Sequence, residues 1–105
     1  LVFENSSREL QIESIKRSAV RTALIVRHID EMLRFYEIYC ESSVKEEDRR
    51  CFRVIKAKYI DEPAMSSLEI AEKEFVDRRT VDRDIQAACQ ALSVLIFGID
   101  GLDCV

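Results

Sequence analysis

The chain has 105 residues, 48% of them hydrophobic and 34% charged, and a formal net charge of −4. This length supports one ordinary hydrophobic core and excludes two comfortable domains. Only two glycines and one proline are present, so long helices can form along most of the chain, and we expect a single all-α domain. No apolar run approaches the roughly 20 residues of a membrane span, and no basic start precedes an apolar signal segment, so we expect a cytoplasmic protein without a membrane partner.

The cysteines and the single histidine give no pattern of metal ligands. The four cysteines, at positions 40, 51, 89 and 104, contain no C-x-x-C pair, and His28 is distant from all of them in sequence. We therefore expect neither a metal nor a cofactor, and we expect reduced cysteines that behave as small apolar residues. We expect the His28 side chain to be satisfied or half-exposed rather than a ligand or base.

A long N-terminal helix is expected over residues 1–41, with Ser6 and Glu9 forming a capping box near its start. From this capping box the pattern continues without a breaker to about Cys40. Roughly 32 helical residues there would span about 48 Å, which exceeds the size of a globule with a radius of gyration of about 13 Å. Such a helix must overhang, bend or find a partner. Because the chain begins at Leu1 rather than at methionine, a preceding segment stays an open alternative.

The second half of this helix carries an apolar arc of about half its circumference, opposite Arg27 and Arg34. The arc comprises Ile25, Ile29, Met32, Leu33, Tyr36 and Tyr39. An arc of this width predicts packing on the domain with one edge and on a second subunit with the other. The alternative is a helix that simply lies in a groove between the later helices.

A middle helix is expected over residues 43–61, starting at a capping box of Ser43 and Glu46 and ending before Pro63. Its apolar side comprises Cys51, Phe52, Val54, Ile55 and Tyr59. Its other side is a basic stripe of Lys45, Arg49, Arg53 and Lys56. The stripe could lie along DNA phosphates, or it could be a solvated face balanced by neighbouring carboxylates.

A helix-turn-helix is expected over residues 66–98. Ser66 and Glu69 form a capping box for its first helix, and Met65 and Ile70 form a hydrophobic staple. Asp77 is the expected N-cap of the second helix. Little more than residues 74–76 remains for the turn, so the two helices abut closely.

The last helix is expected from Arg78 to about Phe97, and Gly98 suits its C-terminus. A heptad-like apolar seam runs along it through Val81, Ile85, Ala88, Leu92 and Leu95. Four consecutive apolar residues at 94–97 cannot be buried by one stripe, so contact with the first helix or with another copy is expected. Residues 99–105 form a tail.

The segment EIAEKEFVDRRTVDRDI resembles the helix-turn-helix signature of sigma-factor region 4 and of many bacterial regulators. The matching residues are Ala71, Val76, Arg79, Thr80, Val81, Arg83 and Ile85. The continuation ALSVLIFGIDGL is similar to the tail of small phage and prophage regulators of the ArpU and RinA type, and the resemblance covers about the C-terminal 40 residues. It implies a sigma-like late-gene activator that acts at promoters and contacts RNA polymerase.

Two residues depart from this signature. Glu74 replaces a small or apolar residue, and Phe75 replaces the glycine or asparagine that tolerates a left-handed backbone. A positive φ is unfavourable for phenylalanine, so we expect Phe75 to fill the core position that Glu74 vacates, with a changed turn geometry.

The face of the last helix opposite Val81 and Ile85 carries side chains suited to reading base edges. The predicted base-reading residues are Arg79, Asp82, Arg83, Gln86 and Gln90. The predicted phosphate-binding residues are Arg78 and Thr80, together with the basic stripe. The alternative is that Arg78 and Asp82 form an exposed intrahelical pair and that the motif mediates protein contacts.

These features predict a sequence-specific DNA-binding regulator, nucleoid-associated and partnered by double-stranded DNA. A homodimer is expected, because two copies would present two recognition helices. The expected dimer contacts are Ile25, Ile29, Met32, Leu33 and Tyr36, or Val94, Ile96 and Phe97, or both sets. One alternative is a protein-interaction module that engages RNA polymerase or a sigma factor without reading DNA. Another is a phage DNA-packaging accessory protein, which ring-like oligomers would favour. We expect no enzyme, because no phosphate-binding loop or nucleophile with a histidine partner is present.

Overall fold

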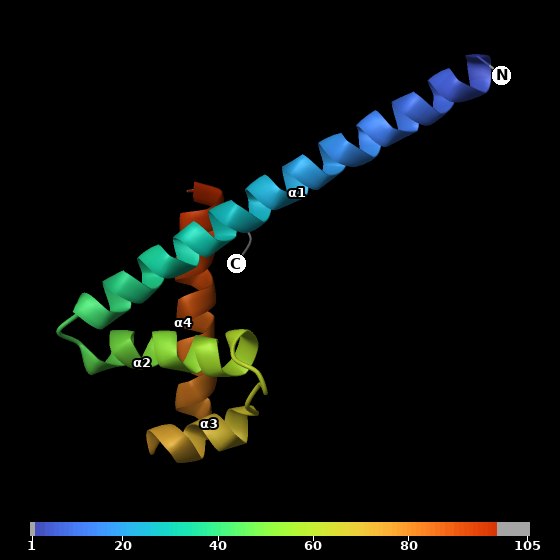
Figure 1. The fold of residues 1–105 in the computed structure, drawn as a ribbon. Helices are drawn as coiled ribbons and strands as arrows, with labels where there is room; N and C mark the ends of the chain where they lie inside the picture. Colours follow the sequence, from blue (N-terminus) through green and yellow to red (C-terminus); the bar gives the residue numbers. More distant parts are fainter. Residues whose placement is uncertain (1, 99–105) are drawn as a thin grey trace. The chain divides into compact units, whose positions relative to one another are not determined.

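The computed structural model describes residues 2–98, with side chains described from Ser6 onward. All its regular elements are helices: α1 (Val2–Ser42), α2 (Glu46–Ile55), the π-helical turn η1 (Lys56–Ile60), α3 (Ser67–Glu74) and α4 (Arg78–Phe97) (Figure 1). No strand occurs within residues 2–98, so the all-α prediction is confirmed. The chain divides into two compact units, Leu1–Glu31 and Met32–Val105. The predicted tail lies outside the described residues.

The first unit is the N-terminal part of α1, and the prediction of a long helix here is confirmed. The predicted capping box at Ser6 is wrong, because α1 begins at Val2 and Ser6 lies inside the helix. Inside a helix the backbone N–H groups are already hydrogen-bonded, so a serine there cannot act as an N-cap. Every side chain from Ser6 to His28 is exposed. Helix α1 ends in the second unit, at Ser42.

Helix α2 begins three residues later than predicted, at Glu46. The N-cap is Lys45, which makes no side-chain capping bond, so the predicted capping box at Ser43 is wrong. The Ser43 hydroxyl instead donates to Asp48 at 2.6 Å and accepts from the Lys45 N–H at 3.2 Å. Carboxylates at 46, 47 and 48 occupy the first turn, where they complement the positive end of the helix dipole.

The middle helix ends at Ile60, one residue before the predicted end, and its last turn is the π-helical η1. The Asp61 N–H donates to the Lys56 carbonyl at 2.9 Å, a bond that spans five residues. An extra residue in a turn rotates the following side chains off the apolar stripe. Ala57 is therefore buried, whereas Tyr59, predicted on the apolar side, is 65% exposed. Cys51, Phe52, Val54 and Ile55 are buried as predicted.

The core of the second unit consists of two clusters that α4 connects. One contains Tyr36, Cys40, Phe52, Ile55 and Ala88, and the other contains Val54, Ala57, Ile70, Ala71 and Val81. Ile85 packs against both clusters, and α2 and α3 both cross α4 (Figure 1). The rings of Tyr36 and Phe52 meet edge to face, with centroids 6.1 Å apart. The predicted seam of α4 is thus the side on which the core is built.

The predicted apolar arc of α1 is only partly buried. Tyr36 is 4% exposed and Cys40 1%, while Met32 and Leu33 are half-buried. Tyr39, another member of the predicted arc, is 59% exposed. The buried positions recur every three or four residues, so the stripe that packs on α2 and α4 is narrower than the predicted arc.

None of the described helices is long and apolar enough to cross a membrane. Within the same part of the chain, no three His, Cys, Asp or Glu side chains are grouped so that they could hold a metal ion. Cys40 and Cys51 are buried free thiols, and Cys89 is an exposed one.

Candidate nucleic-acid interface

The start of α3 is fixed by Ser66, as predicted. The Ser66 hydroxyl accepts from the Glu69 N–H at 3.2 Å, which is the first half of the capping box. In the second half of a capping box, the Glu69 carboxylate accepts from the Ser66 backbone N–H. Here the carboxylate instead accepts from the Ser66 hydroxyl, at 3.1 Å. Met65 and Ile70 belong to the same packed cluster, which agrees with the predicted hydrophobic staple.

The start of α4 is fixed by Asp77, also as predicted. One carboxylate oxygen of Asp77 accepts from both the backbone N–H and the hydroxyl of Thr80, each at 2.8 Å. These two hydrogen bonds, with smaller effects of the nearby Arg79 and Arg83 charges, lower the pKa of Asp77. The predicted phosphate contact of Thr80 therefore competes with the cap, since both donors of Thr80 already point at Asp77.

The turn between the two helices is a Schellman motif. The Phe75 N–H donates to the Glu72 carbonyl at 3.4 Å, and the Val76 N–H donates to the Ala71 carbonyl at 3.1 Å. Val76 packs against the cluster that contains Ala71, and this apolar contact commonly accompanies the motif. Closing the turn in this way places Phe75 in the left-handed region, at φ 57° and ψ 40°.

The prediction that Phe75 fills a core position is wrong, because its side chain is 94% exposed. The expectation of a changed turn geometry is also wrong, because Phe75 adopts the left-handed conformation itself, at φ 57°. A left-handed conformation costs a residue with a Cβ about 1–2 kcal/mol. Two backbone hydrogen bonds and the packing of Val76 outweigh that cost here.

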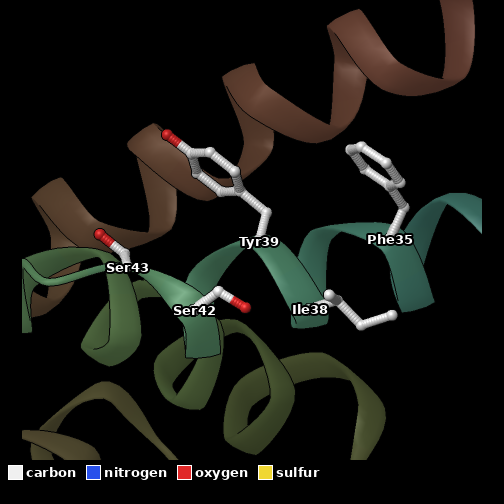
Figure 2. Close-up of a pocket in the computed structure, with 5 residues that line it drawn as sticks. All are labelled: Phe35, Ile38, Tyr39, Ser42 and Ser43. Carbon is white, nitrogen blue, oxygen red and sulfur yellow. The ribbon is translucent and has the colours of Figure 1, made fainter.

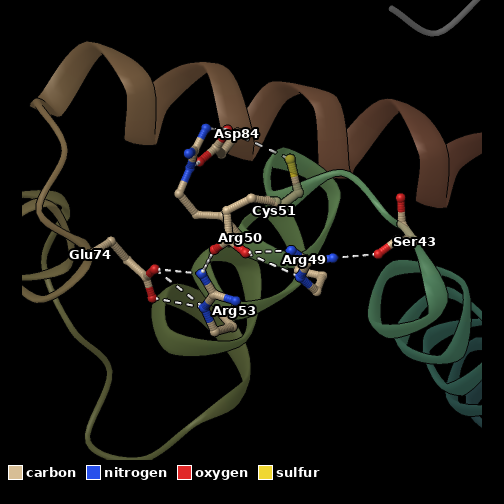
Figure 3. Close-up of polar contacts among 8 residues, drawn as sticks. Ser43, Arg49, Arg50, Cys51, Arg53, Glu74 and Asp84 are labelled. Atoms are coloured by element: carbon tan, nitrogen blue, oxygen red, sulfur yellow. Dashed lines mark hydrogen bonds and ion pairs between the residues drawn. The ribbon is translucent and has the colours of Figure 1, made fainter.

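Glu74 is accommodated by an arginine of α2 (Figure 3). The guanidinium of Arg53 lies 2.8 Å from one Glu74 oxygen and 3.1 Å from the other, and it also contacts Glu46 at 2.6 Å. The Glu74 side chain is only 12% exposed. The contacts to Glu74 and Glu46 raise the pKa of Arg53, so its guanidinium stays charged and joins α2 to the end of α3.

The predicted basic stripe is therefore largely engaged within the fold. Arg49 bonds Glu46 at 2.9 Å and donates to the Ser43 carbonyl, and Lys56 lies 3.6 Å from Asp61. Together with Arg53, three of the four predicted phosphate-binding residues of the stripe have carboxylate partners. Lys45 is exposed at the N-cap of α2. A phosphate contact from the three paired residues would require an exchange of partners.

A buried ion pair that sequence reasoning missed joins α2 to α4. Arg50 donates to Asp84 at 2.6 Å and 3.3 Å, and the thiol of Cys51 contacts Asp84 at 3.6 Å (Figure 3). The side chains of Arg50 and Asp84 are 16% and 7% exposed. The hydrogen bond to Asp84 raises the pKa of Arg50. The available signal was position, because Asp84 lies three residues after Val81 and four before Ala88, on the buried stripe of α4.

The five predicted base-reading residues all lie on the exposed side of α4. These are Arg79, Asp82, Arg83, Gln86 and Gln90. The opposite side of the helix is buried through Val81, Asp84 and Ala88. Within the described residues, none of the five side chains forms a hydrogen bond or a close ion pair, and the alternative pair of Arg78 with Asp82 is not formed. The fold thus brings together one polar face with donors and acceptors available for a ligand.

The second unit also exposes apolar side chains of α1. Phe35, Ile38 and Tyr39 are each more than half exposed and line an open pocket with Ser42 and Ser43. Figure 2 shows the rings of Phe35 and Tyr39 projecting from the same side of the helix. Among the predicted dimer contacts, Ile25 and Phe97 are exposed, and Ile29, Met32, Leu33, Val94 and Ile96 are half-buried. Tyr36 is buried in the core, so its assignment to a dimer contact is wrong.

Comparison with known proteins finds no matching family model, no matching curated protein and no matching solved structure. The resemblance of α3 and α4 to a sigma-like helix-turn-helix therefore depends on the residues of the motif and on their geometry.

Proposed function

We propose that the protein binds double-stranded DNA through α4 and acts as a sequence-specific transcriptional regulator of the sigma-like phage type. One observation carries this proposal: Arg79, Arg83 and Gln86, with two further polar side chains, share one exposed face of a helix whose start is fixed by Asp77. The buried side of the same helix is tied to α2 and α3. A rigid support of this kind is what base reading requires.

The residue types on this face match the hydrogen-bonding groups of base edges in the major groove. An arginine can bond both acceptors of guanine, a glutamine can pair with the donor and acceptor of adenine, and an aspartate can accept from cytosine. Arg79, Asp82 and Arg83 lie in the first two turns of α4, where helices of this motif reach the bases. Each good contact discriminates against the wrong base by about 1–3 kcal/mol.

Electrostatic attraction in this proposal comes from a small set of side chains. The net charge is −4, and the arginines at 49, 50 and 53 are paired within the fold. Arg78, Arg79 and Arg83 are exposed without a close carboxylate partner in the described part of the chain. About three phosphate or base contacts by cations predict a slope of roughly −3 in a plot of log affinity against log salt concentration.

A homodimer is part of the proposal, because two copies present two recognition helices to a twofold site. In the first unit, Ile12, Ile15 and Val26 fall on the a and d positions of one heptad register, and each is at least half exposed. Spacing of this kind is typical of helices that pair with another helix. The proposal also includes contact with RNA polymerase, as the resemblance implies, in a bacterial cell.

The test is a fluorescence-anisotropy titration against labelled duplex DNA from the gene's own neighbourhood and against scrambled duplexes, at about 50 and 200 mM salt. Preference for the native duplex, weakened steeply by salt, supports the proposal. Arg83→Gln should reduce that preference, and Lys73→Gln, an exposed basic residue on α3, serves as its matched control. Absence of binding to either duplex at both salt concentrations overturns the proposal.

The exposed side chains of Phe35, Ile38 and Tyr39 favour a second candidate function, a protein-interaction module. In that case the protein would capture RNA polymerase or a sigma factor tightly and show no salt-dependent affinity for DNA. The same titration distinguishes the two functions, since only the first predicts binding that depends on DNA sequence.

A further inference from the structure

Phe75 combines two properties that the fold does not need. Its backbone is left-handed, at φ 57°, and its ring is 94% exposed. Phe75 has the only positive φ among the non-glycine residues described. Large residues rarely adopt this conformation, and one that does so calls for an explanation.

The turn itself depends on backbone groups and not on the phenyl ring. Its hydrogen bonds use the N–H groups of Phe75 and Val76, and its apolar contact is made by Val76. Glycine or asparagine at position 75 would complete the same motif with less strain. The ring is 94% exposed, so it contributes little to folding and is available for contact with another molecule.

The position of Phe75 indicates which molecule. It stands two residues before Asp77, the N-cap of α4, and the charges of Arg79 and Arg83 act on the carboxylate of Asp77. The turn thus lies at the end of α4 that carries these arginines. In the proposed complex, a duplex on the exposed face of the first turn of α4 would lie at the same end of the helix as this turn.

We propose that Phe75 is a DNA-contacting residue whose ring packs against the apolar surface of the duplex beside the end of α4. This inference rests on the proposed DNA-binding function. The apolar groups available on DNA are the thymine methyl in the major groove and the deoxyribose of the backbone. Phenylalanine is a residue that proteins use for apolar contact with thymine and between base steps.

The experiment compares three variants with the wild type in anisotropy titrations against the same labelled duplexes, at two salt concentrations. Phe75→Asn removes the ring and suits the left-handed backbone, whereas Phe75→Tyr keeps an aromatic ring. Val44→Asn is the matched control, because Val44 is also 94% exposed but lies in the loop between α1 and α2. Urea unfolding of each variant separates binding from folding.

We expect Phe75→Asn to bind the preferred duplex at least fivefold more weakly, with an unchanged salt slope, because an apolar contact releases no counterion. Phe75→Tyr should bind within about twofold of the wild type, and Val44→Asn should equal it. Substituting deoxyuridine for thymidine identifies the group contacted. If the ring meets thymine methyls, the difference between wild type and Phe75→Asn shrinks, and if it meets deoxyribose, the difference persists.

Equal affinity of wild type and Phe75→Asn overturns the inference while leaving the proposed function intact. A change in salt slope also overturns it, since that would indicate a lost ionic contact. If the wild type binds no DNA at all, the proposed function fails first and the role of Phe75 fails with it. Phe75→Asn should be at least as stable as the wild type, so a loss of binding cannot be assigned to unfolding.

Discussion

The buried pair of Arg50 and Asp84 predicts a large and strongly coupled effect of substitution on stability. Each group is mostly shielded from water, and each has the other as its charged partner, at 2.6 Å. Removing one partner leaves an uncompensated buried charge, which costs about 3–5 kcal/mol. We expect the lower end, about 3 kcal/mol, because 16% of the Arg50 side chain stays accessible to solvent. Replacing both partners by apolar residues removes both desolvation costs together.

The assay is a double-mutant cycle in urea, followed by far-UV circular dichroism, with Arg50→Met, Asp84→Leu and the double substitution. With a slope of about 1–1.5 kcal/mol per molar urea, each single substitution should lower the unfolding midpoint by about 2–3 M. The double substitution should restore most of that loss. Lys56→Ala, which breaks the exposed pair with Asp61, should change stability by less than about 1 kcal/mol. Single effects that are small, or that simply add in the double substitution, would refute the reasoning.

The remaining predictions concern binding, the turn and the thiols. Arg83→Gln should reduce the salt slope of DNA binding by about one. Arg53→Gln should leave the slope unchanged, because Arg53 is already paired with carboxylates. Equal slopes for the two variants would contradict this. Phe75→Asn should raise the free energy of unfolding by about 0.5–1 kcal/mol, measured in urea, since it relieves left-handed strain. A thiol reagent should alkylate native Cys89 and spare buried Cys51, as peptide mass spectrometry would show. Burial raises the pKa of Cys51 from 9.0 to about 12. The contribution of this thiol to the free energy of unfolding is therefore complete below pH 9 and is lost as the pH rises toward 12. In Cys51→Ala, the free energy of unfolding should fall less steeply over this pH range.

Sequence reasoning succeeded where one local pattern decides the structure. Ser66 and Asp77 have short polar side chains directly before an apolar-periodic segment, and each proves to be an N-cap. The same holds for the buried stripe of α4 through Val81 and Ala88, which three- and four-residue spacing identifies. At these positions no other residue pattern nearby favours a different conformation.

Predictions from the sequence were wrong where the local structure depends on a distant residue or on a change of helix type. The capping pattern at Ser43 loses to a hydrogen bond with Asp48, and the apolar spacing of Tyr59 loses to the π-helical turn. Asp84 appears in sequence as one more helical carboxylate. Only the approach of Arg50 from α2, 34 residues earlier, makes it a buried partner. Periodicity carries no information about such pairings.

Two adjacent residues of the turn between α3 and α4 differ in role: Glu74 stabilises the fold, and Phe75 belongs to the proposed DNA contact. Glu74 is held by Arg53 and is mostly buried, so substitutions at Glu74 should act on stability. The Schellman hydrogen bonds then fix the backbone of Phe75 and direct its side chain into solvent, whatever residue occupies that position. The fold therefore determines the conformation at position 75 but not the identity of the residue. The proposed contact of its ring with DNA would account for a phenylalanine in this left-handed position.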